Sequence, residues 1–284
     1  MILVTGATGT IGSEVVRQLA ARGEKVRALT RDPERADVPS GVETVRGHPA
    51  DRASVEAALT GVEAAFLVGV FGPDDAEHDR GLVEAARAAA VRRIVKLSGI
   101  GTGEPAVGPV GTWHVAGEQA VRDSGLEWTI LRPSAFATNT LGWAASLRAG
   151  SLVPNTSGDG GQGVVDPRDV SEVAVAALLD PVHAGRTYTL TGPEVLNVPA
   201  QAAVLAEILG RPVPVRDLSS AEAREYLLGL GFSDTFIDAS EISRAFVRNG
   251  GNEVVTDDVR EVLGRPARTY REWVVDHRAA FGEG

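Results

Sequence analysis

The feature that most constrains this chain is its start, MILVTGATGTIGSEVV, where three apolar residues lead directly into a turn rich in glycine. Gly6, Gly9 and Gly12 lie in this turn, and a helical pattern of apolar residues follows at once. The first N–H groups of a helix lack partners within the helix, and the helix dipole is positive at that end. A strand, a glycine turn and a helix in this order therefore predict a site for a diphosphate group.

Each glycine has a separate expected role in that site. Gly6 allows the tight turn, Gly9 lets the backbone approach the phosphates, and Gly12 brings the helix close to the strand. The first gap between the glycines is one residue longer than in the standard dinucleotide fingerprint, so a purely structural turn is the alternative. The expected diphosphate-binding set is Gly6, Thr8, Gly9, Thr10, Ile11 and Gly12.

Beyond the turn, short apolar runs alternate with helical patterns. Such runs are typical of strands buried on both faces, and each is followed by a helix that can cover them. We therefore expect an α/β fold: a Rossmann-type doubly wound parallel sheet with helices on both faces. The expected strands are 2–5, 25–30, 42–46, 64–70, 94–97 and 128–131, and the expected helices are 13–22, 54–59, 79–90 and 114–123.

The regular alternation weakens after Pro133. We expect residues 1–135 to form the dinucleotide-binding Rossmann domain, and residues 136–284 to form a smaller α/β lobe on the substrate side, interleaved with the sheet. The glycine-rich segment 157–163 predicts a flexible connection. The lobe has an expected strand at 186–190 and expected helices at 169–179, 200–209, 221–230, 257–263 and 270–281.

Composition excludes several classes of function. The formal net charge of −10 disfavours a nucleic-acid partner, because proteins that bind the phosphate backbone need a basic surface. The chain has no cysteine, which excludes disulfides, thiolate metal sites and a thiol nucleophile. No run approaches the roughly 20 apolar residues of a membrane span. We expect a cytoplasmic monomer or homodimer that acts on a small-molecule substrate and has no membrane partner.

The end of the second expected strand selects the dinucleotide. An acidic residue there accepts a hydrogen bond from a ribose hydroxyl, whereas an arginine favours the additional 2′-phosphate of NADP(H). The segment LTRDPER places Arg31 just past the strand and Arg35 one turn later, so we expect NADP(H). Asp32 facing the ribose keeps NAD(H) as the alternative. Asp51, after the third strand, is placed either to bind the adenine amino group or to begin a helix.

The later strands of such a sheet end at the ligand crevice, so residues at their carboxyl ends are candidates for the nicotinamide side. Gly69 and Val70 end the fourth strand, and Pro133 to Phe136 follow the sixth. Aromatic side chains beside a nicotinamide hold a planar substrate well. The expected substrate wall is Phe71, Trp113, Phe136 and Asn139, whereas Trp143 is more consistent with the core.

Six segments carry a family resemblance that spans essentially the whole chain. They are TGATGTIG, LTRDPER, LSG, HVAGEQAVRDSGLEWTILRPSAF, VVDPRDVSEVAVAAL and GRPARTYREWVVDHRAAF. Together they resemble the NmrA-like branch of the atypical short-chain dehydrogenases/reductases. The resemblance implies a bound NAD(P)(H) but no single reaction, because the branch includes NADPH-dependent quinone reductases, other small-molecule reductases, and regulators that bind the dinucleotide without chemistry.

The chain departs from the parent superfamily at one informative point. Classical members use a Tyr-x-x-x-Lys pair, and neither Lys25 nor Lys96 lies four residues after a tyrosine. The corresponding helix carries His114 and Glu118, a His-x-x-x-Glu arrangement similar to that of the quinone reductases of the branch. It implies that His114, either neutral or cationic, donates a hydrogen bond to a substrate oxygen and that Glu118 orients His114 or the nicotinamide ribose. A helix-surface pair that only covers the cofactor is the alternative.

Ser98 follows the fifth strand, where the parent superfamily keeps a catalytic serine, and the resemblance implies that it contacts the nicotinamide side. The expected catalytic set is His114, Glu118 and Ser98, and the lack of a recognisable third ligand argues against a metal. We expect an NADPH-dependent oxidoreductase that reduces a quinone, ketone or similar conjugated small molecule by direct hydride transfer. The alternatives are a non-catalytic NADP(H)-sensing regulator and an NAD(P)-dependent isomerase or epimerase.

Overall fold

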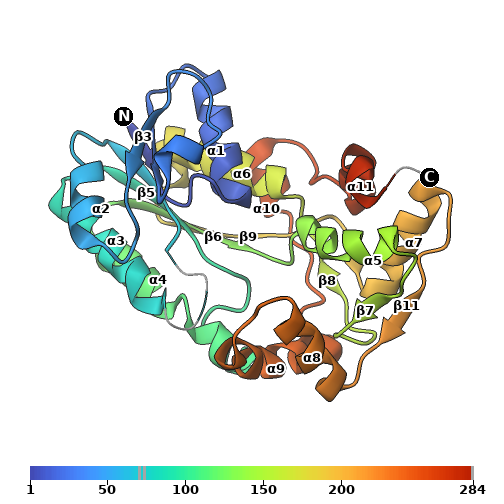
Figure 1. The fold of residues 1–284 in the computed structure, drawn as a ribbon. Helices are drawn as coiled ribbons and strands as arrows, with labels where there is room; N and C mark the ends of the chain where they lie inside the picture. The colour runs from blue at the N-terminus through green and yellow to red at the C-terminus, as the bar shows by residue number, and fades with distance from the viewer. Residues whose placement is uncertain (70–71, 73–74, 283–284) are drawn as a thin grey trace.

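The computed structural model describes residues 1–69, 72 and 75–282. A seven-stranded sheet in the order β3-β2-β1-β4-β5-β6-β9 forms its centre, and every neighbouring pair of strands is parallel (Figure 1). The strands are β1 (Ile2–Val4), β2 (Val26–Thr30), β3 (Glu43–Arg46), β4 (Ala64–Leu67), β5 (Arg93–Leu97), β6 (Glu127–Pro133) and β9 (Arg186–Leu190). The expected Rossmann-type parallel sheet is confirmed.

Helices cover both faces of this sheet (Figure 1). One face carries α1 (Thr10–Ala21), α6 (Pro167–Leu179) and α10 (Asp258–Leu263), and the other carries α2 (Arg52–Ala58), α3 (Ala76–Ala88) and α4 (Val115–Asp123). Successive side chains of a strand point to opposite faces. In β1, Ile2 and Val4 are accordingly buried with Val15 of α1. Leu3 is buried on the other face with Leu82 of α3.

The ligand crevice lies where the strand order reverses, between β1 and β4. Thr5 ties these two strands together at their carboxyl ends. Its buried hydroxyl donates to the carbonyl oxygen of Val68 at 3.0 Å and accepts the Val68 N–H at 2.6 Å. The glycine turn begins at the next residue, so its position relative to β4 is set by these hydrogen bonds.

The second half of the chain returns to this sheet. β9 pairs with β6, and α6 packs against α1. The two expected domains thus share one sheet, and the boundary between 1–135 and 136–284 stays a prediction. Trp143 is buried in a core of its own half, as expected. The remaining elements are α5 (Ala144–Arg148), β7 (Val153–Asn155), β8 (Gln162–Gly163), β10 (Val195–Leu196), α7 (Val198–Leu209), β11 (Val215–Asp217), α8 (Ser220–Gly229), α9 (Asp234–Arg248) and α11 (Tyr270–Asp276).

The segment 157–163 is closely packed, which corrects the expectation of a flexible connection. A Cβ atom on Gly160 would lie 2.0 Å from the carbonyl oxygen of Val247. One on Gly163 would lie 2.3 Å from the carbonyl oxygen of Val254. These glycines let one backbone segment touch another, a use of glycine that composition alone does not distinguish from a linker.

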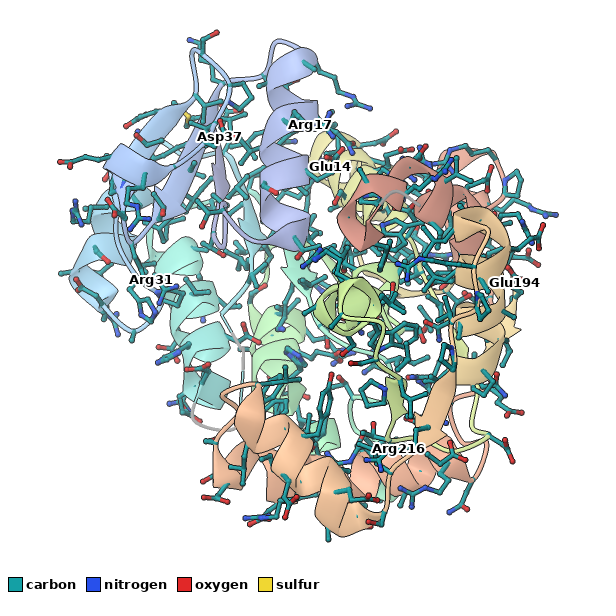
Figure 2. All side chains as sticks on the ribbon, turned by 45° about the vertical axis from the view of Figure 1, so that its right-hand side comes forward. Glu14, Arg17, Arg31, Asp37, Glu194 and Arg216 are labelled. Atoms are coloured by element: carbon teal, nitrogen blue, oxygen red, sulfur yellow. The ribbon has the colours of Figure 1, made fainter. Side chains whose placement is uncertain are left out.

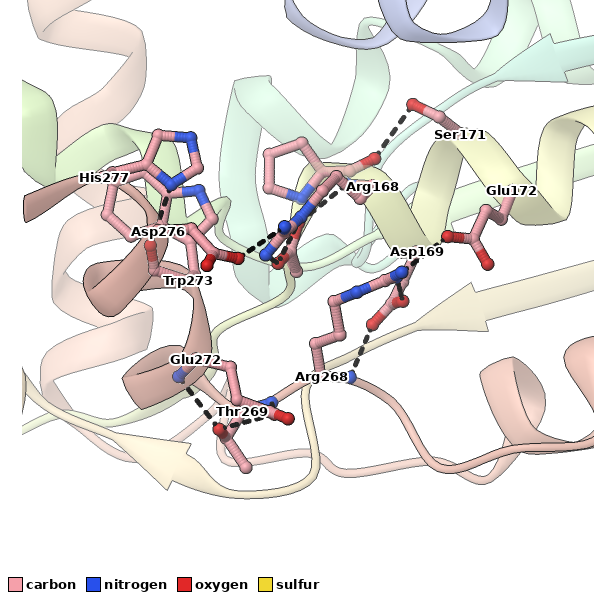
Figure 3. A network of polar contacts seen from close by, with 12 residues as sticks. Arg168, Asp169, Ser171, Glu172, Arg268, Thr269, Glu272, Trp273, Asp276 and His277 are labelled. Atoms are coloured by element: carbon pink, nitrogen blue, oxygen red, sulfur yellow. Dashed lines mark hydrogen bonds and ion pairs between the residues drawn. The ribbon is translucent and has the colours of Figure 1, made fainter. Parts of the chain in front are cut away.

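A network of ion pairs holds the end of the chain against α6 (Figure 3). Asp169 is fully buried and accepts hydrogen bonds from the backbone N–H of Arg268 at 2.7 Å and the guanidinium of Arg265 at 2.8 Å. The guanidinium of Arg268 also pairs with Asp169. On the same helix, the hydroxyl of Ser171 lies 3.3 Å from the carbonyl oxygen of Ile11 in α1. α6 therefore connects the C-terminal segment to the helix that follows the glycine turn.

Replacing Asp169 with Asn is expected to lower the free energy of unfolding by about 2–4 kcal/mol, because Arg265 and Arg268 lose the fully buried one of the two carboxylates that they share and keep only Glu172. Urea unfolding followed by circular dichroism measures this difference. Asp257→Asn is the matched control, since its carboxylate is exposed and lies 3.9 Å from Arg260, so stability should not change measurably. Equal losses in the two variants would contradict the role assigned to Asp169.

Candidate active site

The glycine turn has the geometry that a diphosphate site requires. Gly6 has a φ of +60°, which residues with side chains rarely adopt, and Gly9 is the N-cap of α1. A Cβ atom on Gly12 would lie only 2.2 Å from the carbonyl oxygen of Gly6, so α1 begins in direct contact with the turn. Within the described residues, no side chain caps this end of α1. Its N–H groups are therefore available to a phosphate.

A first cleft of about 560 Å³ lies on one side of this turn. It extends to the ends of β2 and β3, which is where the adenosine half of a dinucleotide lies in this type of fold. Four predicted residues, Gly6, Thr8, Gly9 and Arg31, line the first cleft. The other described residues of its lining were not predicted; they are Leu29, Thr30, Gly47, His48, Pro49 and Asp75.

A second cleft of about 330 Å³ lies on the other side of the turn. Predicted residues make up most of its lining: Gly6, Gly9, Thr10, Ile11, Gly12, Ser98, His114 and Phe136, together with Val68 and Leu97. Both clefts include Gly6 and Gly9, so one ligand can extend from the first cleft into the second across the glycine turn. A dinucleotide with its diphosphate at the turn and a nucleoside in each cleft fits this arrangement.

The residues expected around the adenosine do not all lie at the first cleft. Arg31 follows β2, has an exposed side chain and lines the first cleft (Figure 2). Arg35 ends a short 3-10 helix, Pro33–Arg35, and lies outside the lining of that cleft. Asp51 is the N-cap of α2, where its carboxylate accepts the N–H of Ser54 at 3.3 Å. Two roles were left open for Asp51, and in the structure it has the second of them, at the start of a helix.

Glu118 holds Ser98 in place at the second cleft. The hydroxyl of Ser98 donates to Oε1 of Glu118 at 2.6 Å, and Arg132 donates to both oxygens of this carboxylate at 2.8 and 2.6 Å. Arg122 donates to it as well, at 2.8 Å. Burial raises the pKa of Glu118, but the hydrogen bonds from Arg132, Ser98 and Arg122, with the charge of Arg132, together outweigh burial and hold this pKa below its usual value. Of the two expected roles of Glu118, the one toward His114 is corrected, because its carboxylate binds Ser98; the role toward the nicotinamide ribose stays a prediction.

A different carboxylate lies beside His114. His114 is the N-cap of α4, and its Nδ1 lies 3.3 Å from Oδ2 of Asp79 and 3.2 Å from Nζ of Lys96. Asp79 and Lys96 pair at 2.6 Å with both side chains fully buried, whereas the His114 side chain is 18% exposed. Burial raises the pKa of Asp79, yet the charge of Lys96 and the hydrogen bonds from His114 and Lys96 together outweigh burial and bring this pKa below its usual value.

The residues expected to form the substrate wall do not all line the second cleft. Of its members among the described residues, Phe136 alone lines the second cleft. Trp113 packs instead against Phe236 of α9, with ring centroids 5.6 Å apart. Asn139 is exposed and lines neither cleft. The helix α9, which the sequence analysis did not predict, therefore covers one expected wall residue.

The ends of β4 and β6 differ from expectation in detail. Gly69 lies beside Asp79, since a Cβ atom on it would be 2.8 Å from Oδ1 of that residue, and Val68 lines the second cleft in its place. Pro133 is buried at the end of β6 and lines neither cleft. Two further predicted residues, Val70 and Phe71, lie outside the described residues.

Sequence reasoning missed the pairing of Asp79 with Lys96, although both residues left a signal. Asp79 precedes Leu82 and Ala86 at helical spacing, which puts a carboxylate on the apolar face of a helix. Lys96 interrupts the apolar run of a strand that is buried on both faces. Buried charges are rare unless they are paired, so the two patterns together point to a buried ion pair.

The polar contacts of the site are hydrogen bonds and ion pairs between side chains. Within residues 1–69, 72 and 75–282, no group of three or more histidine or acidic side chains is placed to hold a metal ion. Of the helices in this same part of the chain, none has both the length and the apolar content to cross a membrane.

Known proteins show similarity over the whole chain. The sequence profile of a family described as NAD(P)H-binding matches residues 6–181. A (4-alkanoyl-5-oxo-2,5-dihydrofuran-3-yl)methyl phosphate reductase of Streptomyces griseus is 43% identical over 99% of each chain, and an NAD(P)H azoreductase of Xenophilus azovorans is 36% identical over 99% of each. The crystal structure of an NADPH-dependent quinone oxidoreductase of Escherichia coli with NADPH is 27% identical. It covers 98% of this chain and 100% of its own, with a TM-score of 0.85.

The chain therefore belongs to the NAD(P)H-binding family. The matched region begins at Gly6, the first glycine of the turn. Both the resemblance to the NmrA-like atypical short-chain dehydrogenases/reductases and the expected class of enzyme, an NAD(P)H-dependent oxidoreductase, are confirmed.

Gly12→Ala is expected to weaken NADPH binding by at least about tenfold, because the added Cβ atom must push α1 away from the turn and displace its N–H groups. Isothermal titration calorimetry measures the affinity. Gly81→Ala in α3 is the matched control: Gly81 is exposed and nothing lies within 4 Å of an added Cβ atom, so the affinity should not change. Unchanged binding in Gly12→Ala would rule out a diphosphate at this turn.

Proposed function

We propose that this protein is an NADPH-dependent reductase of a conjugated small molecule, such as a quinone or a conjugated ketone. The observation that carries the proposal is the meeting of two clefts at the glycine turn, with His114, Ser98 and Phe136 lining the second. A nicotinamide held in the second cleft lies next to groups that can position an acceptor and donate a hydrogen bond to it.

The activities named for the relatives support this class of acceptor. An unsaturated furanone, an azo compound and a quinone each contain an electrophilic double bond in conjugation. Each is reduced by the addition of one hydride and one proton. The chain matches the relatives named for these substrates over nearly its full length.

In this proposal the chain supplies position and a hydrogen-bond donor, and NADPH, when bound, supplies the hydride. The N–H groups at the start of α1 bind the diphosphate. Ser98, held by Glu118, contacts the nicotinamide side of the second cleft, and the ring of Phe136 flanks the planar acceptor. His114 donates a hydrogen bond to the substrate atom that gains negative charge as the hydride arrives, and solvent water supplies the proton that completes the reduction.

Arg31 supports NADPH rather than NADH as the cofactor. It lines the first cleft from the end of β2, beside the expected position of the adenosine ribose. A guanidinium there pairs with a 2′-phosphate through two charged hydrogen bonds. Asp32, which would support NAD(H), lies outside the lining of this cleft, and its N–H lies 3.3 Å from the hydroxyl of Thr30.

Purified protein is expected to oxidise NADPH with at least one member of a panel of quinones, azo dyes and unsaturated lactones. The absorbance of reduced nicotinamide, followed under nitrogen, measures the reaction, and product analysis identifies the reduced acceptor. The Gly12→Ala variant is the control for cofactor-dependent turnover. Binding of NADPH without its consumption by any acceptor would overturn the proposal and favour a non-catalytic NADP(H) sensor.

Arg31→Ala is expected to raise the Kd of NADPH about 10- to 100-fold, because a hydrogen bond to a charged phosphate contributes about 1.5–3 kcal/mol. The Kd of NADH, which has no 2′-phosphate, should change by less than about twofold. Titration calorimetry with both nucleotides measures these constants. Arg35→Ala is the control on the same loop and should change neither. Equal weakening of the two nucleotides by Arg31→Ala would contradict the assignment.

A further inference from the structure

Three elements bring a lysine, an aspartate and a histidine together at the second cleft. Lys96 comes from β5, Asp79 from α3, and His114 from the N-cap of α4. Nζ of Lys96 lies 2.6 Å from Oδ2 of Asp79 and 3.2 Å from Nδ1 of His114. It also donates to the carbonyl oxygen of Leu97 at 2.8 Å. The proposed function uses only His114, so the buried pair behind it needs an explanation of its own.

Stability is a weak explanation for this pair. Removing two charges from water costs about as much as their attraction returns, and well-packed apolar residues often stabilise a protein more. The surrounding backbone also leaves space for it. A Cβ atom on Gly117 would lie 2.5 Å from Cβ of Asp79 and 2.8 Å from Cε of Lys96. A Cβ atom on Gly69 would lie 2.8 Å from Oδ1 of Asp79, so glycines border the pair on two sides.

The hydrogen-bond count of Lys96 defines the state of His114. A protonated lysine has three N–H donors and no acceptor. Its three acceptors here are Oδ2 of Asp79, the carbonyl oxygen of Leu97 and Nδ1 of His114. Nδ1 accepts only when it carries no proton, and the proton of a neutral imidazole is then on Nε2. Nε2 lies near the residue that follows Ser98: a Cβ atom on Gly99 would be 4.0 Å from it.

We propose that Lys96 and Asp79 are positioning residues for the reductase reaction: Lys96 donates to Nδ1 and so keeps His114 neutral, with its one ring proton on Nε2 and directed to the second cleft. The inference rests on the proposed function, because a substrate atom in that cleft is what the Nε2–H meets. Asp79 holds the ammonium group of Lys96 in place through their ion pair. A donor oriented before the substrate arrives needs no reorganisation during hydride transfer.

The opposite arrangement is a protonated His114 whose Nδ1–H donates to Oδ2 of Asp79, 3.3 Å away. One N–H of Lys96 then loses its acceptor in a fully buried position, which is unfavourable. Two positive groups would also share one carboxylate. Among the described residues, the charged groups that contact the His114 ring are Asp79 from α3 and Lys96 from β5. The donor count and the charge balance therefore both favour the neutral ring.

The tautomer of His114 tests the inference without any turnover. In protein with ¹⁵N-labelled histidine, a long-range ¹H–¹⁵N correlation spectrum distinguishes protonated from unprotonated ring nitrogens, and the spectrum of His114→Gln assigns the signals. At neutral pH we expect an unprotonated Nδ1 and a protonated Nε2 on His114. A protonated Nδ1, either in the other neutral tautomer or in the cation, would overturn the inference.

Lys96→Met removes the donor atom Nζ and replaces the rest of the side chain with an unbranched apolar chain that ends where Cε of Lys96 lies. We expect a mixture of His114 tautomers, a kcat reduced about 10- to 100-fold and a Kd for NADPH within about twofold of the original value. Lys25→Met is the matched control, because Lys25 is the only other lysine of the chain and is exposed; it should change none of these. Should the single variant not fold, the double variant Lys96→Met with Asp79→Leu removes the unpaired charge and gives the same test.

The inference and the proposed function fail in different ways. The expected tautomer in a protein that reduces no acceptor would support the inference about His114 and contradict the proposed function. Turnover by a protein whose His114 has a protonated Nδ1 would support the proposed function and contradict the inference about His114. A loss of kcat in Lys96→Met without any change of tautomer would assign the pair a packing role and overturn the inference.

Discussion

The contact between Gly12 and the carbonyl oxygen of Gly6 is the constraint on which the rest of the site depends. Because no side chain lies between helix and turn at this point, α1 starts against the turn and its first N–H groups reach the crevice. Thr5 fixes the turn to β4 through Val68, and both clefts begin at the same glycines. A dinucleotide held here by its diphosphate can extend into both clefts, so a packing contact near the start of the chain determines where such a ligand lies.

Two polar networks border that second cleft, and each aligns one side chain. Glu118, with Arg132, orients the hydroxyl of Ser98, while Lys96 and Asp79 lie behind the ring of His114. In both networks a buried carboxylate is matched by charged donors from a neighbouring element, which favours one rigid arrangement. The networks join β5 and β6 of the sheet to α3 and α4 on one face. The geometry of the site is therefore a property of how this face is packed.

The second half of the chain supports the site from the opposite direction. α6 lies between the C-terminal segment and α1, with Asp169 buried in the ion pairs of Arg265 and Arg268. α9 packs against the segment that precedes His114: a Cβ atom on Gly108 would lie 2.7 Å from Cγ2 of Ile242. Both contacts join residues far apart in the chain. They hold the two ends of the crevice, the start of α1 and the start of α4, in one structure.

The sequence by itself was enough to predict the parallel sheet, the helices on both faces and the dinucleotide turn, because each of these is a local pattern of apolar spacing or glycine placement. It also identified Ser98 and Phe136 as residues of one crevice, since the carboxyl ends of parallel strands meet at one edge, and the family resemblance added His114 to them. Only the tertiary structure decided that Asp79 lies beside His114 while Glu118 binds Ser98, and that β9 completes the main sheet. Spacing along one helix shows which residues share a face, but the partner that a buried charge meets depends on which other element packs against that face.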